Sequence, residues 1–195
     1  MKTALAVALA LVLSTVGASG AVQAADIWDD LSQADGAVVL YRHALAPGGG
    51  DPPDFDVQDC ASQRNLSAAG RRQAVRMGRQ LRKNDVPVAR VLSSPWCRSR
   101  DTARLMRQGP VRELMRLGSV FQSSERTANR RQRATERLIR RHGDRDGVLV
   151  IVGHQANIID LTGIAPTSGE GVVVRANQAT GDLEVLGRVP APSTR

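Results

Sequence analysis

Short apolar runs alternate with segments of helical periodicity along this chain, and this alternation constrains the fold more than any other feature. Residues 37–41 and 148–152 are continuous apolar runs, and residues 88–92 form a further short strand pattern. A strand without polar interruption is typical of a sheet that is buried on both faces. Strands that alternate with helices indicate a mainly parallel sheet with helices on both sides.

The segments between the strands carry the pattern of amphipathic helices. Ser67 has the chemistry of an N-cap residue, and the helix after it is expected to run to about Asn84 with one apolar face. A strand and a loop are expected over residues 111–120. Further helices are expected over residues 26–34, 98–108, 125–141 and 156–161.

The last part of the chain predicts two more strands, over residues 171–176 and 183–189, joined by a turn near Gly181. Such a hairpin adds antiparallel strands at an edge of the sheet. The fold class expected from the sequence is therefore α/β. It is a three-layer α/β/α sandwich with a mainly parallel sheet and an antiparallel edge hairpin.

The N-terminal residues have the layout of a secretory signal peptide. Lys2 gives a positive start, and the apolar run over residues 4–18 is shorter than the roughly 20 residues of a membrane-spanning helix. Small residues before an expected cut after Ala24 complete the pattern. We expect residues 1–24 to be removed and residues 25–195 to form one periplasmic or secreted domain. A permanent membrane anchor is the alternative, and no stable membrane insertion is expected after cleavage.

The positive charge of the chain comes almost entirely from arginine. The formal net charge is +8, and Lys2 and Lys83 are the two lysines. A basic surface attracts phosphorylated or otherwise anionic partners. No basic stretch is interleaved with aromatic residues as in proteins that bind single-stranded nucleic acid, so no nucleic-acid partner is expected. The arginines between Arg126 and Arg141 are either a solvated helix face or a docking surface for an anionic substrate or membrane.

Polar side chains of one chemical type follow three of the predicted strands. Arg42 and His43 come after the first strand, Arg98 comes shortly after the second, and His154 comes after the third. Ligands of parallel sheets bind at the carboxyl ends of the strands, so these four side chains are expected to converge. Guanidinium groups match phosphate oxygens, and a neutral imidazole is a competent nucleophile toward phosphorus. The cluster predicts phosphoryl transfer.

Four motifs resemble those of the histidine phosphatase superfamily, whose fold is phosphoglycerate mutase-like. They span most of the chain from about Val38 to Val174. The motifs are Arg42-His43-Ala44, with Ala44 where the family has Gly; Asn65-Leu66-Ser67 with Gly70 and Gln73-Ala74; Ser93-Ser94-Pro95 with Arg98 and Thr102-Ala103; and Val152-Gly153-His154.

The resemblance implies an exported phosphomonoesterase that forms a phosphohistidine intermediate on His43. Arg42 and Arg98 would hold the phosphoryl oxygens, and His154 would stabilise the transition state. The long loop after the first strand, together with the residues after His154, is similar to an exported bacterial branch that includes lipopolysaccharide-core heptose phosphatases. The expected substrate is a small phosphorylated molecule or a phosphorylated glycan, with Arg64 and Gln155 as further substrate-binding candidates.

The general acid is less well defined by the sequence. The superfamily supplies a carboxyl group either beside the second histidine, where this chain has Gln155, or after the third strand. Glu125 lies in that later segment and is the expected acid. Its charge would also suit a helix N-terminus without any catalytic role. Glu113 and Asp51 are further candidates.

Cys60 and Cys97 are expected to form a disulfide, because exported proteins meet an oxidising compartment and both cysteines should border the site. Two separate buried thiols are the alternative. No metal site and no cofactor are expected, since the cysteines lack zinc spacing and the carboxylates do not cluster with the histidines.

Two other functions share the site chemistry. A phosphoglycerate mutase-type phosphotransferase has the same motifs, but its substrates are cytoplasmic and the chain is short for the additional substrate-binding segments. A non-catalytic phosphate- or anion-binding protein would retain the pocket without turnover.

Overall fold

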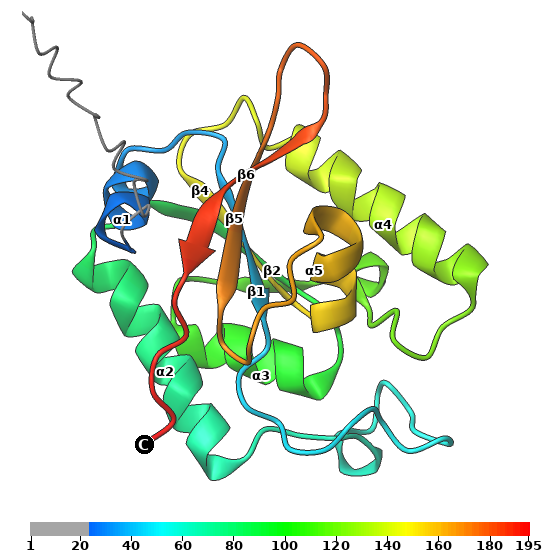
Figure 1. The fold of residues 1–195 in the computed structure, drawn as a ribbon. Coiled ribbons are helices and arrows are strands. Elements are labelled where there is room, and N and C mark those ends of the chain that lie inside the picture. Colours follow the sequence, from blue (N-terminus) through cyan, green and yellow to red (C-terminus); the bar gives the residue numbers. More distant parts are fainter. Residues whose placement is uncertain (1–23) are drawn as a thin grey trace, which may run out of the picture.

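A six-stranded sheet with the order β3-β2-β4-β1-β5-β6 forms the centre of the molecule (Figure 1). The structure, a computed structural model, describes residues 24–195, and nearly all of the expected signal peptide lies outside the described residues. The strands are β1 (Val38–Arg42), β2 (Val88–Ser93), β3 (Val111–Glu113), β4 (Val148–Gly153), β5 (Gly171–Ala176) and β6 (Leu183–Val189).

The first four strands of the chain run parallel to one another, and the C-terminal hairpin is antiparallel. β1 pairs in parallel with β4, and β2 pairs in parallel with both β4 and β3. β5 pairs antiparallel with β1 on one side and with β6 on the other. The predicted mainly parallel sheet with an antiparallel edge hairpin is confirmed.

Helices cover both faces of the sheet, which confirms the predicted three layers (Figure 1). On one face lie α1 (Ala24–Ser32), α2 (Ala68–Lys83) and α3 (Cys97–Met106). On the other face lie α4 (Glu125–Arg140) and α5 (Gln155–Thr162), together with a short 3-10 helix, η2 (Met115–Leu117). A second 3-10 helix, η1 (Cys60–Ser62), lies in the long loop after β1.

The two apolar cores explain why the central strands carry no polar interruption. In β1, Val39 and Tyr41 belong to the core beneath α1, α2 and α3, while Val38 and Leu40 belong to the core beneath α4 and α5. Successive side chains of a strand point to opposite faces, so a strand between two helical layers needs apolar residues at every position. The same alternation continues in β4, all of whose residues are buried.

The helix α2 is fixed at its start by a side-chain cap and along its length by a close approach to α3. The Ser67 hydroxyl accepts a hydrogen bond from the Gly70 N–H at 3.0 Å, as the N-cap prediction required. Gly78 faces α3 so closely that a Cβ atom would lie 1.9 Å from the carbonyl oxygen of Met106. A glycine therefore allows the two helices to approach at this point.

The connections that leave the carboxyl ends of β1, β2 and β4 all carry polar residues. β1 leads into the long loop that contains η1, β2 leads into α3, and β4 leads into α5. Among residues 24–195, no helix is both long and apolar enough to cross a lipid bilayer.

Candidate active site

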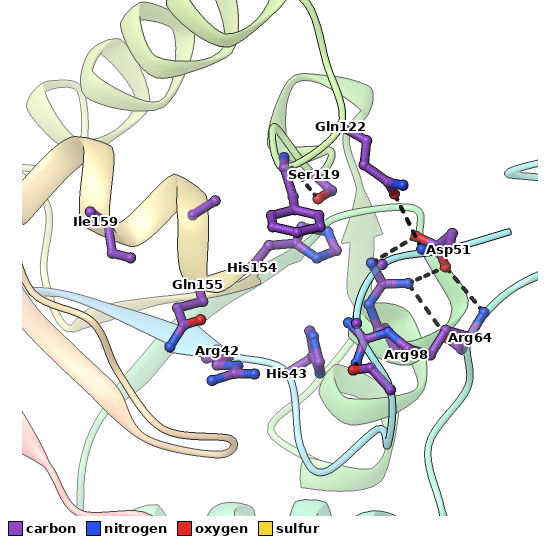
Figure 2. Close-up of a pocket in the computed structure, with 15 residues that line it drawn as sticks. Arg42, His43, Asp51, Arg64, Arg98, Ser119, Gln122, His154, Gln155 and Ile159 are labelled. Atoms are coloured by element: carbon purple, nitrogen blue, oxygen red, sulfur yellow. Dashed lines mark hydrogen bonds and ion pairs between the residues drawn. The ribbon is translucent and has the colours of Figure 1, made fainter. Parts of the chain in front are cut away.

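A cavity of about 330 Å³ lies at the carboxyl ends of the central parallel strands (Figure 2). The structure brings together there Arg42, His43, Arg98 and His154, which the sequence placed at strand ends, and also Arg64 and Gln155. The remaining lining residues are Gly48, Gly49, Gly50, Asp51, Ser119, Phe121, Gln122, Ala156 and Ile159.

His43 directly follows β1 and is almost completely buried. Its Nδ1 lies 2.8 Å from the carbonyl oxygen of Ala44. Because a carbonyl oxygen can only accept, Nδ1 carries the proton, and the lone pair is left on Nε2. The pKa of His43 is lowered to about 3, chiefly by burial; the Ala44 contact raises it, and the charges of Arg98, Arg64 and Arg42 lower it. The imidazole is therefore neutral at physiological pH.

His154 is the N-cap residue of α5 and lies beside His43, with ring centroids 5.7 Å apart. Its Nε2 is 2.8 Å from the hydroxyl oxygen of Ser94, which follows β2. The ring also meets Trp96 edge to face at a centroid distance of 5.6 Å. Burial, followed by the charge of Arg98, holds the pKa of His154 well below 6.5. The site thus contains two adjacent neutral imidazoles in fixed orientations.

Arg98 is held in a bidentate ion pair with Asp51, and both side chains are almost fully buried. Its Nη1 donates to Oδ1 of Asp51 at 2.7 Å and its Nη2 donates to Oδ2 at 3.0 Å. The same carboxylate accepts from the Arg64 backbone N–H at 3.1 Å (Figure 2). It also accepts from Nε1 of Trp96 at 3.1 Å. The bidentate contact fixes the guanidinium plane of Arg98.

Arg42 and Arg64 are oriented by backbone carbonyl oxygens. Nη1 of Arg42 donates to Pro166 at 3.1 Å, and Nη1 of Arg64 donates to Gly48 at 3.1 Å. The Nε atoms of Arg42, Arg64 and Arg98 are buried and have no hydrogen-bond partner among the described residues. Buried donors without acceptors are rare in proteins. Three guanidinium groups that line one cavity suit a multiply charged oxyanion.

Of the other expected site residues, Gln155 lies at the cavity and Glu125 does not. Gln155 begins α5 and lines the cavity, where its Nε2 donates to the Pro166 carbonyl oxygen at 3.0 Å. Glu125, expected as the general acid, does not line the cavity, because it sits in the first turn of α4 with an exposed side chain. Glu113 instead pairs with Arg104 at 2.9 Å. Of the carboxyl candidates, only Asp51 lies at the cavity, and it is engaged by Arg98.

Two site contacts were not expected from the sequence. Sequence reasoning named Asp51 only as a possible acid and did not pair it with Arg98, which lies 47 positions further along the chain. It also did not pair Ser94 with His154, which is 60 positions away. No periodicity connects such distant residues. The one available signal was that each of them lies in a segment that follows a strand.

Cys60 and Cys97 form a disulfide with a Cα–Cα distance of 5.7 Å, which confirms the expected pairing. Because Cys97 directly precedes Arg98, the bridge ties the loop that carries Asp51 to the start of α3. Within residues 24–195, no cluster of three or more histidine, cysteine or carboxylate side chains has the arrangement of a metal site.

Residues 38–118 match the family model of the histidine phosphatase superfamily (branch 1). This range contains His43 and Arg98, while His154 lies beyond it. No curated protein matches the sequence significantly.

Several solved structures share the fold. The protein histidine phosphatase SixA complexed with tungstate has a TM-score of 0.57 and 18% identity, over 81% of this chain and 97% of that chain. A mycobacterial glucosyl-3-phosphoglycerate phosphatase with inorganic phosphate has a TM-score of 0.57 and 17% identity, over 81% and 98%. A phosphoserine phosphatase from Entamoeba histolytica in complex with phosphoserine has a TM-score of 0.59 and 13% identity, over 80% and 97%.

At these identities the structural likeness concerns the fold alone, and it extends over nearly the whole length of each of these proteins. The family match covers the part of the chain from β1 to the loop after η2, which includes the first two of the three strand ends at the cavity. Over residues 38–118 this chain is thus similar in sequence to the histidine phosphatase superfamily, and over most of its length it shares the fold of these phosphatases.

Proposed function

We propose that the protein is a phosphomonoesterase that transfers a phosphoryl group from its substrate to Nε2 of His43 and then to water. One observation carries this proposal. Three arginine side chains line one cavity together with a neutral imidazole whose free lone pair is on Nε2.

The electrostatics of the cavity suit a phosphate dianion. Arg42, Arg64 and Arg98 supply three positive charges, and Asp51 neutralises one of them. The two histidines add no charge because both are neutral. The net charge of about +2 matches a dianionic phosphoryl group, which guanidinium forks contact through its equatorial oxygens.

In the first step, the Nε2 lone pair of His43 attacks phosphorus and the ester oxygen leaves with the electrons of the broken P–O bond. The nucleophile needs no prior deprotonation because its pKa lies near 3. The arginines stabilise the charge on the transferring group, and His154 contacts it from the other side. In the second step, water attacks the phosphohistidine and releases phosphate, which restores neutral His43.

Protonation of the leaving oxygen needs a proton donor at the cavity, and Asp51 is the carboxyl candidate that lines it. Asp51 accepts four hydrogen bonds, so it acts as a positioning residue for Arg98 and is a poor proton donor. We therefore propose that the enzyme favours esters whose leaving group departs without strong acid catalysis. Turnover of an aryl phosphate should exceed that of an alkyl phosphate of similar size.

The finer assignments rest on the sequence pattern and the disulfide. A disulfide is typical of proteins from oxidising compartments, which supports a periplasmic or secreted location after removal of residues 1–24. The proposed substrate is a small phosphorylated molecule or a phosphorylated glycan, in line with the similarity to lipopolysaccharide-core heptose phosphatases.

Trapping of the phosphoenzyme tests the proposal. Purified protein is mixed with a radiolabelled phosphomonoester, quenched in alkali and mapped by peptide mass spectrometry. We expect an acid-labile label on the peptide that contains His43, turnover that resists EDTA, and loss of both label and turnover in His43→Asn. His154→Asn serves as the matched variant, and it should still form the label, but more slowly.

Other outcomes would indicate a different function. A label on another residue, or inhibition by EDTA, would contradict the proposed mechanism. Tight phosphate binding without turnover of any ester would indicate an anion-binding protein. Transfer of the label to a second hydroxyl compound in preference to water would indicate a mutase-type phosphotransferase.

A further inference from the structure

One face of α4 carries a row of exposed arginines, which we call the arginine stripe. An α-helix turns by about 100° per residue about its axis, and on this basis the arginines of the stripe fall within a sector about 100° wide. Of the buried residues of the helix, Thr135 and Ile139 lie on the opposite side, and Ala134 lies just beyond one edge of the sector. The stripe consists of Arg126, Arg130, Arg133, Arg137, Arg140 and the C-cap residue Arg141.

None of these six side chains has an ion-pair partner among the described residues. Other arginines of the molecule do have partners: Arg71 pairs with Asp101 at 3.0 Å, and Arg131, on the inner side of α4, stacks on Trp96. The two glutamates of α4 lie outside the sector of the stripe. Arginines three and four positions apart repel one another, so the stripe weakens its own helix, and no ion pair among residues 24–195 offsets this repulsion.

The shape of the stripe fits a flat anionic surface. A helix of 16 residues presents its row of guanidinium groups along about 24 Å. The phosphate groups at the surface of an anionic bilayer form a plane that such a row contacts along its whole length. Charge complementarity therefore indicates a lipid surface that carries negative headgroups.

Exposed apolar side chains lie on the segment that leads into α4. Met115 is 53% exposed and Phe121 is 65% exposed. Phe121 lies four residues before the start of α4 in the sequence, and exposed aromatic side chains near a basic helix occur in proteins that rest in the interfacial region of a membrane. Phe121 also lines the cavity that contains His43, so contact through this residue brings the mouth of the cavity to the same surface.

We propose that the arginine stripe docks the protein on the negatively charged surface of a phospholipid bilayer. Docking is peripheral and electrostatic, with Phe121 and Met115 reaching into the headgroup region. It is independent of the proposed chemistry at His43, because no residue of the stripe lines the cavity. It gives the enzyme access to phosphorylated molecules held at a membrane surface.

Vesicle sedimentation of the purified protein tests the proposal. One set of vesicles is pure phosphatidylcholine and the other contains about one third phosphatidylglycerol, which supplies the negative surface potential. We expect binding to the anionic vesicles to be at least about tenfold stronger and to be lost in high salt, where surface charges are screened. Equal binding to both sets would overturn the proposal.

A matched pair of triple variants separates the stripe from the general charge of the protein. Arg130→Gln/Arg133→Gln/Arg137→Gln removes three charges from the stripe. Arg72→Gln/Arg79→Gln/Lys83→Gln removes three exposed charges from α2. Glutamine and arginine have similar helix propensities, so both variants should keep their helical circular dichroism. Every variant is prepared with the same N-terminus, so any binding through that end of the chain cancels in the comparison.

We expect the stripe variant to bind anionic vesicles about 100-fold more weakly, at about fivefold per arginine, and the α2 variant to lose no more than a few-fold. Both variants should hydrolyse a soluble ester at the rate of the unmodified protein. An equal loss of vesicle binding in the two variants would show that binding depends only on the net charge of the protein, and it would overturn the proposal. Tighter binding to a DNA duplex than to anionic vesicles at equal phosphate concentration would also overturn it, in favour of a nucleic-acid surface.

Discussion

At the scale of single residues, the contacts of Asp51 are those of a side chain that positions the guanidinium group of Arg98. Its carboxylate holds the two terminal nitrogens of Arg98 and takes two more donors from Arg64 and Trp96. Removal of one partner from a buried ion pair is strongly destabilising, because the other charge remains buried without compensation. Arg98 therefore depends on Asp51 for its orientation, and the charge of Asp51 offsets the cost of burying the Arg98 guanidinium group.

Replacement of Asp51 by asparagine tests this dependence. Asp51→Asn keeps the size of the side chain but removes its charge, so we expect a loss of stability of about 3 kcal/mol. We also expect kcat/KM to fall about 100-fold, because a misplaced guanidinium no longer meets the transition state. Asp54→Asn, at an exposed position in the same loop, is the control. An unchanged inhibition constant for inorganic phosphate in Asp51→Asn would contradict the positioning role.

The histidines predict how stability depends on pH. Burial lowers the pKa of His43 from 6.5 to about 3, and the pKa values of His154 and His142 also lie below 6.5 in the folded protein. As the pH falls below about 6.5, the unfolded chain binds protons at these positions and the folded protein does not. The free energy of unfolding should therefore be highest above pH 6.5 and fall by up to about 1.4 kcal/mol per pH unit for each histidine.

Urea unfolding between pH 8 and pH 4.5 measures this slope. His43→Asn should fall less steeply than the unmodified protein between about pH 6.5 and 4.5, since one histidine no longer contributes. In the pH profile of kcat/KM, the decrease at acidic pH should follow the second pKa of the substrate phosphate, near 6. It should not follow the pKa of His43. Identical slopes for the two proteins would show that His43 titrates normally in the folded state.

At the scale of elements, the close approach of α2 to α3 depends on Gly78. A Cβ atom at this position would overlap the Met106 carbonyl oxygen at 1.9 Å, and a backbone atom has little freedom to move away. Gly78→Ala gains up to about 1 kcal/mol of helix propensity but forces the two helices apart. We expect a net loss of about 1–3 kcal/mol, measured by thermal unfolding. Gly49→Ala, where a Cβ meets no atom within 4 Å, should leave the melting temperature nearly unchanged.

The disulfide joins two other elements, the loop after β1 and the helix α3. It closes a sequence separation of 37 residues, for which the loss of chain entropy in the unfolded state corresponds to about 4 kcal/mol. We expect Cys60→Ser/Cys97→Ser to be less stable by about this amount and to have lower activity, because Arg98 follows Cys97 directly. A reductant should lower the stability of the unmodified protein and leave the double variant unaffected. Full activity of the double variant would show that loop packing alone fixes Arg98.

At the scale of the whole molecule, the N-terminal pattern predicts processing. Residues 1–24 should be removed on export, so the mature protein should begin at Ala25. Intact-mass analysis of protein recovered from the periplasm or the medium measures the cut directly. Replacement of Ala24 by a bulky charged residue should block cleavage and leave the uncut protein on the membrane. Recovery of full-length protein with unmodified Ala24 would instead support a permanent anchor.

The arrangement of the whole molecule also explains why a basic protein can be both an enzyme and a surface-binding protein. The cavity lies at the carboxyl ends of the parallel strands, whereas the arginine stripe lies on the outer side of α4. The arginines of the cavity are oriented by Asp51 and by backbone carbonyl groups, and those of the stripe are exposed. The same residue type thus serves two roles that differ in burial and in partners.

Local patterns in the sequence determined the elements and the placement of the main site residues. The apolar run of β4 and the cap at Ser67 act over a few residues, and the strand-end rule then predicted that His43, Arg98 and His154 would meet. Only the tertiary structure decided that Asp51 holds Arg98, that Ser94 contacts His154, and that Glu125 remains away from the cavity. The physical reason is that side-chain direction and loop path depend on contacts between residues far apart in the chain, which carry no periodic signal in the sequence.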